Sequence, residues 1–283
     1  MLGAGFTVYT AADFDRQPAF AAAFDALCDA DWRAAGVWRW RDFLRADGPH
    51  PMVVIAQCDT SGTLLGVIVG LWQPEPVNRF DDLFDRATEL SPRWRDELGW
   101  PIGGFWHFIA LTVAPAARGS GAQQALVAAA LAWVLDRGGV AQVRTLSPAQ
   151  GLPEAATALA SIPACAGLAT QDRMRLAIAG LCDEKGRPWL PILRVHPFNG
   201  ADLEALLFDS RADEVRSGAV TLRFAYHRNA DARAAQLVAL HTWVAARAAA
   251  IAAGEAQQVE TGRGPAWFVE PTGALAPPWS GLR

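Results

Sequence analysis

The segment from Val113 to Ala122 has the residue types of a phosphate-binding site. An apolar strand is predicted to end at Val113, Pro115 opens a turn containing Gly119 and Gly121, and a helix is predicted to follow at once. The first N–H groups of a helix have no partner within the helix, and the dipole adds about +0.5 of a charge there. Glycine lets the backbone approach a ligand closely. We therefore expect a pyrophosphate or a phosphopantetheine phosphate to bind at this turn.

Two other phosphate-binding patterns do not fit the segment. A Walker A loop requires Gly-Lys-Ser/Thr, and no such triplet follows Gly121. The dinucleotide fingerprint requires a third glycine and an acidic residue at the end of a following strand, and neither is present. A glycine-containing strand–helix turn without a ligand remains the plain alternative.

The segment resembles the acetyl-CoA motif of the GNAT superfamily, in which Val-x-Pro ends a strand and Arg/Gln-x-x-Gly-x-Gly/Ala opens a helix. Val113, Pro115, Arg118 and Gly121 match this pattern, whereas Gln123 stands where a small residue is usual. The resemblance implies a slot for pantetheine between splayed fourth and fifth strands. It also implies that CoA or phosphopantetheine is held by Val113, Arg118, Gly119, Ser120, Gly121 and Ala122.

A second block, residues 183–226, resembles the C-terminal part of the GNAT-like decarboxylases in polyketide synthase loading modules. Ser210 replaces an aromatic residue of that family, and Arg216–Ala219 replaces an Asn and a Gly-Tyr-Gly run. The two blocks together cover roughly residues 100–226. The residues that match in the second block are Gly186, Pro191, Ile192, Leu193, Arg194, His196, Gly200, Ala201, Arg211, Asp213 and Gly218.

The resemblance implies a catalytic pair made of a histidine and a hydroxyl on the fifth strand. The histidine corresponds to His196. The hydroxyl falls within Arg144–Ser147, where Ser147 matches without a gap and Thr145 is the alternative. Without the resemblance, a histidine at the end of an apolar strand is more often structural, and Ser147 before Pro148 could merely end a strand.

Two further positions are implied to line a substrate tunnel. The family's tunnel tryptophan corresponds to Trp40, with Trp38 as the alternative. Arg211 corresponds to an arginine near the phosphate or carrier end of the tunnel. Trp40 could equally be a core residue, and Arg211 could pair on the surface with Asp209 or Asp213, an interaction of small energy.

These residue types suit the decarboxylation of a malonyl or methylmalonyl thioester. Loss of carbon dioxide makes an enolate, whose oxygen needs a hydrogen-bond donor worth about 3–4 kcal/mol. A hydroxyl at Ser147 or Thr145 can donate, and His196 could supply the proton that the carbanion takes near neutral pH. The expected ligands are an acyl-CoA and an acyl carrier protein, and the chemistry requires no metal.

Two other functions stay open. An N-acetyltransferase would take acetyl from acetyl-CoA to an amine and usually needs a tyrosine to protonate the thiolate. The chain has only Tyr9 and Tyr226, and Tyr226 lies where the family uses none, so this reading is disfavoured. A non-catalytic module that binds a carrier protein is favoured by the departures at Gln123, Ser210 and Arg216–Ala219.

The hydrophobic pattern predicts the elements that must position these residues. Turn residues at 59–62 join two apolar runs into a hairpin, and strands followed by helices after Phe105 indicate an α/β fold. The last thirty residues are Gly- and Pro-rich and are expected to run over the surface. Helices are predicted over 11–47, 123–136, 153–179 (broken near Pro163 and Gly167) and 230–253, and strands over Met52–Ala56, Leu64–Leu71, Phe105–Val113, Val140–Leu146, Leu190–Val195, Leu203–Phe208 and Val220–Tyr226.

Composition restricts the class of protein. With 283 residues, 52% of them hydrophobic, the chain is long enough for one large core. The net charge of −4 gives no sign of a nucleic-acid-binding protein. No signal peptide or membrane span is expected, and four scattered cysteines favour a reducing, cytoplasmic compartment.

The predicted fold class is therefore α/β (α+β). It is a GNAT fold with a mixed central sheet, splayed fourth and fifth strands, flanking helices, and extensions at both ends. We divide the chain into an N-terminal helical part of the same unit at 1–50, a catalytic domain at 51–229, and a C-terminal helix with an irregular tail at 230–283.

Overall fold

The computed structural model describes residues 5–34, 52–77, 79, 82, 103–136, 140–210 and 219–282. These residues form two compact units, Met1–Leu146 and Ser147–Arg283, each of which is described by itself. The predicted division at residues 50 and 229 is based on the predicted elements and not on compactness, so it stays a prediction.

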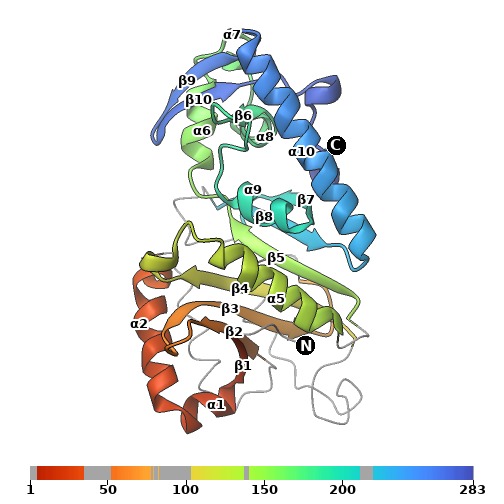
Figure 1. The fold of residues 1–283 in the computed structure, drawn as a ribbon. Helices are drawn as coiled ribbons and strands as arrows, with labels where there is room; N and C mark the ends of the chain where they lie inside the picture. The colour runs from red at the N-terminus through yellow and green to blue at the C-terminus, as the bar shows by residue number, and fades with distance from the viewer. Residues whose placement is uncertain are drawn as a thin grey trace. The chain divides into compact units, whose positions relative to one another are not determined.

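Five strands form the sheet of the first unit (Figure 1). The first four pair antiparallel in chain order, and the predicted hairpin at 59–62 is confirmed. The Asp59 carboxylate closes that turn, since it accepts hydrogen bonds from Ser61 N and Thr63 N. The strands are β1 (Phe6–Thr10), β2 (Met52–Cys58), β3 (Leu64–Gln73), β4 (Phe105–Val113) and β5 (Gln142–Pro148).

The predicted splay of the fourth and fifth strands matches the pairing of β4 with β5. This pairing is parallel and runs from Phe105 opposite Gln142 to Phe108 opposite Thr145. The register between these two strands ends at that pair, so Ile109–Val113 of β4 run on beyond the part paired with β5. Because this pairing is parallel and the pairings of β1 to β4 are antiparallel, the sheet is mixed, and the predicted α/β class is confirmed.

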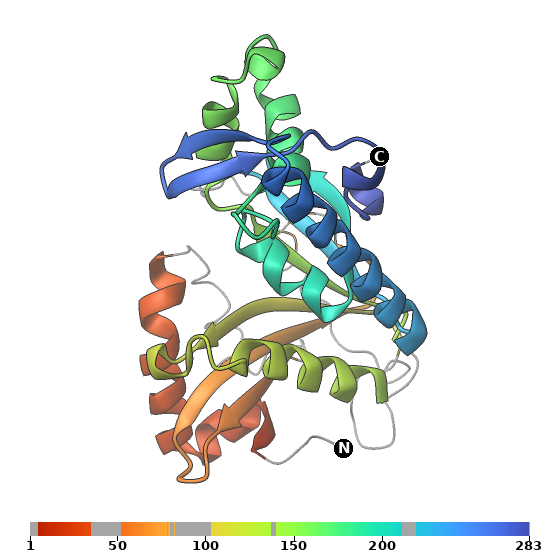
Figure 2. The ribbon, with the colours of Figure 1, turned by 45° about the horizontal axis from the view of Figure 1, so that its top comes forward.

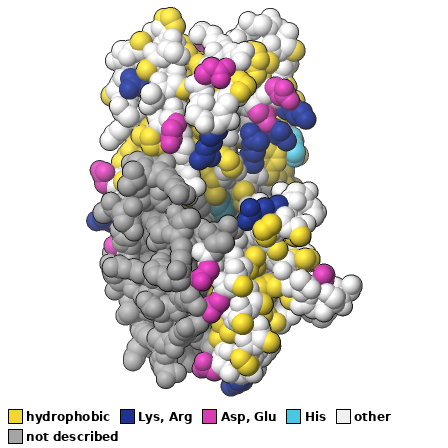
Figure 3. All heavy atoms as spheres, turned by 90° about the vertical axis from the view of Figure 1, so that its left-hand side faces the viewer, with side chains coloured by type: hydrophobic (Ala, Val, Ile, Leu, Met, Phe, Trp, Pro, Cys, Tyr) yellow, Lys and Arg dark blue, Asp and Glu magenta, His cyan; other side chains and the backbone are white. Residues whose placement is uncertain are grey.

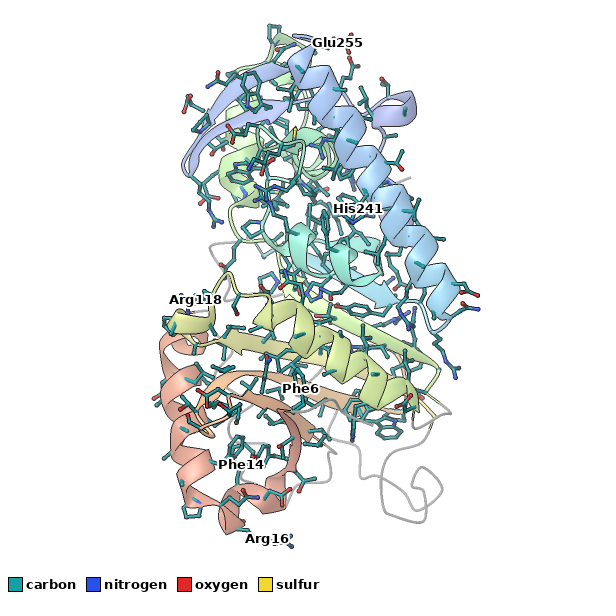
Figure 4. All side chains as sticks on the ribbon, in the orientation of Figure 1. Phe6, Phe14, Arg16, Arg118, His241 and Glu255 are labelled. Atoms are coloured by element: carbon teal, nitrogen blue, oxygen red, sulfur yellow. The ribbon has the colours of Figure 1, made fainter. Side chains whose placement is uncertain are left out.

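Helices of the first unit pack on this sheet and present the turn before α5 (Ala122–Asp136). This helix contacts β2, β3 and β4 through an inward face that includes Leu126, Val127 and Val134. In α1 (Ala11–Arg16), Phe14, labelled in Figure 4, makes edge-on ring contacts with Phe20 and Phe24 of α2 (Pro18–Ala34). Burial of these apolar faces is the main stabilising contribution.

The second unit combines helices with a hairpin and a small three-stranded sheet (Figure 2). The predicted helical region at 153–179 is confirmed with its two breaks, and the helix over 230–253 is confirmed. The helices are α6 (Leu152–Leu159), α7 (Pro163–Ala166), α8 (Thr170–Gly180), α9 (Ile192–Val195) and α10 (Ala230–Ala252). The strands are β6 (Leu181–Cys182), β7 (Ala201–Leu207), β8 (Thr221–Tyr226), β9 (Gln257–Thr261) and β10 (Gly264–Phe268).

The strand predicted over Leu190–Val195 is wrong, because these residues form the short helix α9. Pro191 already has helical dihedral angles, φ −56° and ψ −37°, and His196 N donates to Ile192 O at 3.3 Å. A short apolar run is equally compatible with a buried strand or a buried helical turn. In this protein the run forms a helical turn, so His196 lies at the end of a helix and not at the end of a strand.

The C-terminal segment is also not the irregular surface tail that the composition suggested. β10 pairs antiparallel with both β9 and β6, so the segment completes a sheet with residues near position 181. Val259, Phe268 and Trp279 are buried. The glycine and proline residues of this segment lie in a tight turn and at strand ends of a packed structure.

The helix α10 packs one face on the second unit. Leu240, Trp243 and Arg247 are buried, and the Arg247 guanidinium donates to Gly180 O at 2.8 Å and lies 4.2 Å from the Trp243 ring centroid. By length and composition alone, with a mean hydropathy of 1.2, α10 could also cross a membrane. A core helix passes the same test, so the absence of a membrane span stays a prediction.

Candidate active site

The backbone around His196 is held by three hydrogen bonds. His196 N donates to Ile192 O, and His196 O accepts from Asn199 N at 3.0 Å and Ala201 N at 3.1 Å. Gly200, with φ +81°, lets the chain turn from a 3-10 helix directly into β7. The imidazole therefore projects from a rigid corner between α9 and β7, which is the kind of support that a reactive side chain needs.

His196 contacts two hydroxyl groups, one at each ring nitrogen. Nε2 lies 3.1 Å from Ser147 Oγ, and Nδ1 lies 2.6 Å from Tyr226 Oη. The Phe224 ring packs on the imidazole with a centroid distance of 4.8 Å. Ser147, His196 and Tyr226 are all buried and all belong to the second unit, so the structure brings Ser147 and His196 together as the resemblance implied.

Secondary structure positions both hydroxyl groups. Ser147 is the last residue but one of β5, and the next turn is held by a hydrogen bond from Ala149 N to Val220 O at 3.0 Å. Tyr226 ends β8, where it lies on the same face as Phe224 because side chains alternate along a strand. Three elements that are distant in sequence therefore meet around one imidazole.

Burial sets the protonation states of this cluster. Removal from water disfavours the charged imidazolium and lowers the pKa of His196 to about 3. Burial likewise raises the pKa of the Tyr226 phenol. Both groups are therefore neutral near pH 7, which corrects the expectation that His196 supplies a proton there as an ordinary histidine. A neutral ring still donates one hydrogen bond and accepts another.

Sequence reasoning missed Tyr226, which it placed where the family uses no tyrosine. The alternation Leu222-Arg223-Phe224-Ala225-Tyr226 shows which side chains share a face, but it does not show that this face meets residue 196. The available signal was the rarity of tyrosine, since this chain has only two.

Of the other residues predicted to act in catalysis or to line the tunnel, the structure describes only Thr145. Thr145 is buried in β5 and lies opposite Phe108 of β4, in the first unit. Its role as the alternative hydroxyl stays a prediction, as does the catalytic role of Ser147 and His196. Trp40, its alternative Trp38, and Arg211 lie outside the described residues.

The predicted phosphate-binding turn has the expected conformation. A 3-10 helix over Pro115–Ala117 follows β4, and Gly119 and Gly121 have φ values of +79° and +88°. Arg118 Nε donates to Val113 O at 3.3 Å, so the arginine, labelled in Figure 4, braces the turn. A Cβ at either glycine would meet no atom within 4 Å, so both are needed for their left-handed conformation and not for close packing.

Hydrogen bonds at this turn leave several N–H groups for a ligand. Ser120 N donates to Ala117 O, and Ala122 N lies 3.4 Å from Ser120 Oγ. The N–H groups of Gly119, Gly121 and Gln123 donate to no acceptor among the described residues. Open N–H groups at and just before a helix N-terminus suit a phosphate or pyrophosphate. The predicted binding roles of Val113, Arg118, Gly119, Ser120, Gly121 and Ala122 stay predictions.

The charged side chains of the described residues bear on nucleic-acid and metal binding. On the face shown in Figure 3, dark blue Lys and Arg side chains lie near magenta Asp and Glu side chains and do not form one basic area. In the part of the chain that the structure describes, no group of three or more His, Cys, Asp or Glu side chains could hold a metal ion. That no metal is needed stays a prediction.

Comparisons with known proteins agree with the fold. Residues 17–153 match the family model described as Acetyltransferase (GNAT) family. None of the curated proteins matches the chain. Malonyl-CoA decarboxylase from Cupriavidus metallidurans matches with a TM-score of 0.53 and 15% identity over 83% of this chain. The match covers 63% of that protein, so this chain spans less than two thirds of its length.

Two other solved structures are similar at lower scores. The loading GNATL domain of CurA from Lyngbya majuscula has a TM-score of 0.47 and 14% identity, covering 79% of this chain and 98% of that domain. The GphF GNAT-like decarboxylase in complex with isobutyryl-CoA has a TM-score of 0.47 and 19% identity, covering 79% and 99%. The predicted resemblance to the GNAT superfamily is confirmed by the family match and by the fold.

Proposed function

We propose that this chain, a GNAT-fold protein, is an enzyme that decarboxylates a malonyl or methylmalonyl thioester. The observation that carries the proposal is the buried pair of Ser147 and His196, whose polar atoms lie 3.1 Å apart. The resemblance of residues 183–226 to the loading-module decarboxylases supports the malonyl substrate. The family match at 17–153 supports an acyl thioester as the ligand.

The site offers a hydrogen-bond donor for the step that needs it. When the bond from the α-carbon to the carboxylate breaks, its electron pair enters the thioester and carbon dioxide leaves. The negative charge then gathers on the thioester oxygen, and the α-carbon takes up one proton that comes from the solvent. Ser147 Oγ–H is the donor for that oxygen, and the neutral His196 orients Ser147. Donors fixed before the reaction stabilise such a charge most effectively.

The turn before α5 supplies binding. The open N–H groups of Gly119, Gly121 and Gln123 would hold the pyrophosphate of CoA or the phosphate of a phosphopantetheine arm. Since both ligands share that phosphate and the thioester, an acyl carrier protein is an alternative donor or an acceptor of the acyl group.

The direct test is to incubate the purified protein with malonyl-CoA or methylmalonyl-CoA, with and without a phosphopantetheinylated acyl carrier protein, and to follow thioester masses. We expect loss of the mass of carbon dioxide from the CoA thioester or from the loaded carrier. If both substrates remain intact and no acyl group moves, the proposal is wrong.

The N-acetyltransferase reading is favoured by the description of the matched family. It predicts release of free CoA when acetyl-CoA is mixed with an amine panel, and no change in malonyl-CoA. Binding of CoA or carrier protein without turnover of any thioester would instead favour a non-catalytic module.

Replacing Gly121 with alanine is expected to weaken CoA binding about 10-fold. The φ of +88° is unfavourable for alanine by about 1–2 kcal/mol, so the turn would change shape and turn its N–H groups away from the phosphate. Titration calorimetry with CoA measures the effect. Gly254→Ala is the matched control, because Gly254 has φ +75°, no atom within 4 Å of an added Cβ, and a place after α10 in the second unit. Equal affinities of the two variants would contradict the role of the turn.

A further inference from the structure

Tyr226 is a hydrogen-bonding member of the reactive cluster that neither the resemblance nor the family match assigns. Its hydroxyl oxygen lies 2.6 Å from His196 Nδ1, and Tyr226 is 2% exposed. A neutral imidazole carries its single hydrogen on one nitrogen and a lone pair on the other. The direction of the Tyr226 hydrogen bond therefore decides what the ring presents to Ser147.

Two distances point to the same arrangement of hydrogens. An N–H donor lies about 2.7–3.2 Å from an oxygen, whereas a hydroxyl donor lies closer, at about 2.5–3.0 Å from an oxygen acceptor. The 2.6 Å contact at Nδ1 suits Tyr226 O–H as the donor, and the 3.1 Å contact at Nε2 suits a ring N–H donating to Ser147 Oγ. Together the two distances favour the form in which Nε2 carries the hydrogen.

The chemistry of the two groups favours the same direction. A phenol O–H is a stronger acid than a neutral imidazole N–H, and an imidazole nitrogen is a stronger base than a phenol oxygen. The stronger donor is thus paired with the stronger acceptor when Tyr226 donates to Nδ1. Burial keeps the phenol protonated and the imidazole neutral near pH 7. The phenol therefore keeps the hydrogen that it donates, and the imidazole keeps the lone pair that accepts it.

Packing holds the imidazole ring in this orientation. Phe224 lies against one face of the imidazole, and the Tyr226 ring meets it edge-on with a centroid distance of 6.0 Å. The backbone of His196 is held on both sides by the hydrogen bonds to Ile192 and Ala201. A ring flip would break both hydroxyl contacts at once.

We propose that Tyr226 is a positioning residue that fixes His196 in the tautomer with its hydrogen on Nε2. In this state the imidazole donates to Ser147 Oγ, and the Ser147 hydrogen turns away from the ring toward another acceptor. Ser147 is then a hydrogen-bond donor to a ligand oxygen. The opposite tautomer would take the Ser147 hydrogen and make the serine a nucleophile. The catalytic consequence rests on the proposed function, but the tautomer itself does not.

The tautomer is measured by NMR on the full chain with ¹⁵N-labelled histidine. The His196 signals are identified by their loss in His196→Gln. We expect a protonated Nε2 and a non-protonated, hydrogen-bonded Nδ1 in the unmodified protein. A hydrogen on Nδ1 overturns the proposal, and this result needs no variant and no enzymatic turnover.

Tyr226→Phe removes the hydroxyl and keeps the ring. We expect the Nδ1 signal to shift and kcat for malonyl-CoA to fall about 10–100-fold with little change in KM, the usual effect of losing a supporting hydrogen bond. Tyr9→Phe, at the other tyrosine of the chain, is the control and should leave both unchanged. An unchanged Nδ1 signal in Tyr226→Phe contradicts the proposal. If malonyl-CoA is not turned over but Nε2 carries the hydrogen, the proposed function fails and the tautomer assignment survives.

Discussion

Ser147→Ala is expected to lower kcat for malonyl-CoA decarboxylation about 100–1,000-fold, with KM changed by no more than about 3-fold. The hydroxyl is proposed to donate to an oxygen that becomes strongly negative only as the carbon–carbon bond breaks. Its removal therefore destabilises the transition state much more than the bound substrate. Acetyl-CoA formation under saturating malonyl-CoA gives kcat directly.

Two variants control this experiment. Ser161→Ala removes an exposed hydroxyl that contacts only the nearby Ala158 carbonyl, so its activity should be unchanged. Thr145→Ala tests the alternative hydroxyl on the same strand. If Thr145→Ala loses more activity than Ser147→Ala, the assignment of the donor to Ser147 is wrong. Circular dichroism melting confirms that each variant folds.

Acidification from pH 7 to pH 5 is expected to reduce the free energy of unfolding by about 2 kcal/mol through His196 alone. The pKa of this residue is about 3 in the folded protein, against about 6.5 in the unfolded chain. Between these values the unfolded chain binds one more proton at this position, so stability falls as the pH falls. The loss begins near pH 6.5 and would reach roughly 5 kcal/mol below pH 3.

Urea unfolding at pH 5, 6 and 7 measures this dependence. His196→Gln should flatten the curve between pH 7 and 5, because glutamine has no proton to bind. His241→Gln, at an exposed histidine on α10, is the matched variant that shows the effect of losing a histidine elsewhere on the surface. An unfolding free energy that falls equally steeply in His196→Gln would show that the acid sensitivity arises elsewhere.

The elements that the sequence predicts well are those fixed by local interactions. The apolar run of β4, Pro115, two glycines and an alanine-rich helix specify the strand, the turn and α5 within about thirty residues. The left-handed φ of Gly119 and Gly121 follows from residue type and turn position. No distant partner is needed for these features.

Prediction failed where distant partners decide the structure. The apolar run at Leu190–Val195 has no hydrophobic periodicity that would distinguish a strand from a helix. In the structure, Pro191 has helical dihedral angles and the run forms a short helix. β1 was missed because its five residues become a strand only beside β2. Tyr226 was missed because its partner lies thirty residues earlier, on an element whose type was mistaken.

The sheet formed by β6, β10 and β9 has a consequence for synthesis of the protein. Cys182 Sγ lies 3.4 Å from the Trp267 carbonyl, a contact that spans eighty-five positions. A nascent chain that has reached residue 256 lacks β10, the strand that pairs with β6, and β9, the strand that pairs with β10. Val269, which packs in the same buried cluster as Cys182, is also not yet present. Folding of the second unit must therefore wait until residues 257–282 leave the ribosomal tunnel, and a growing chain would expose apolar surface to chaperones until then.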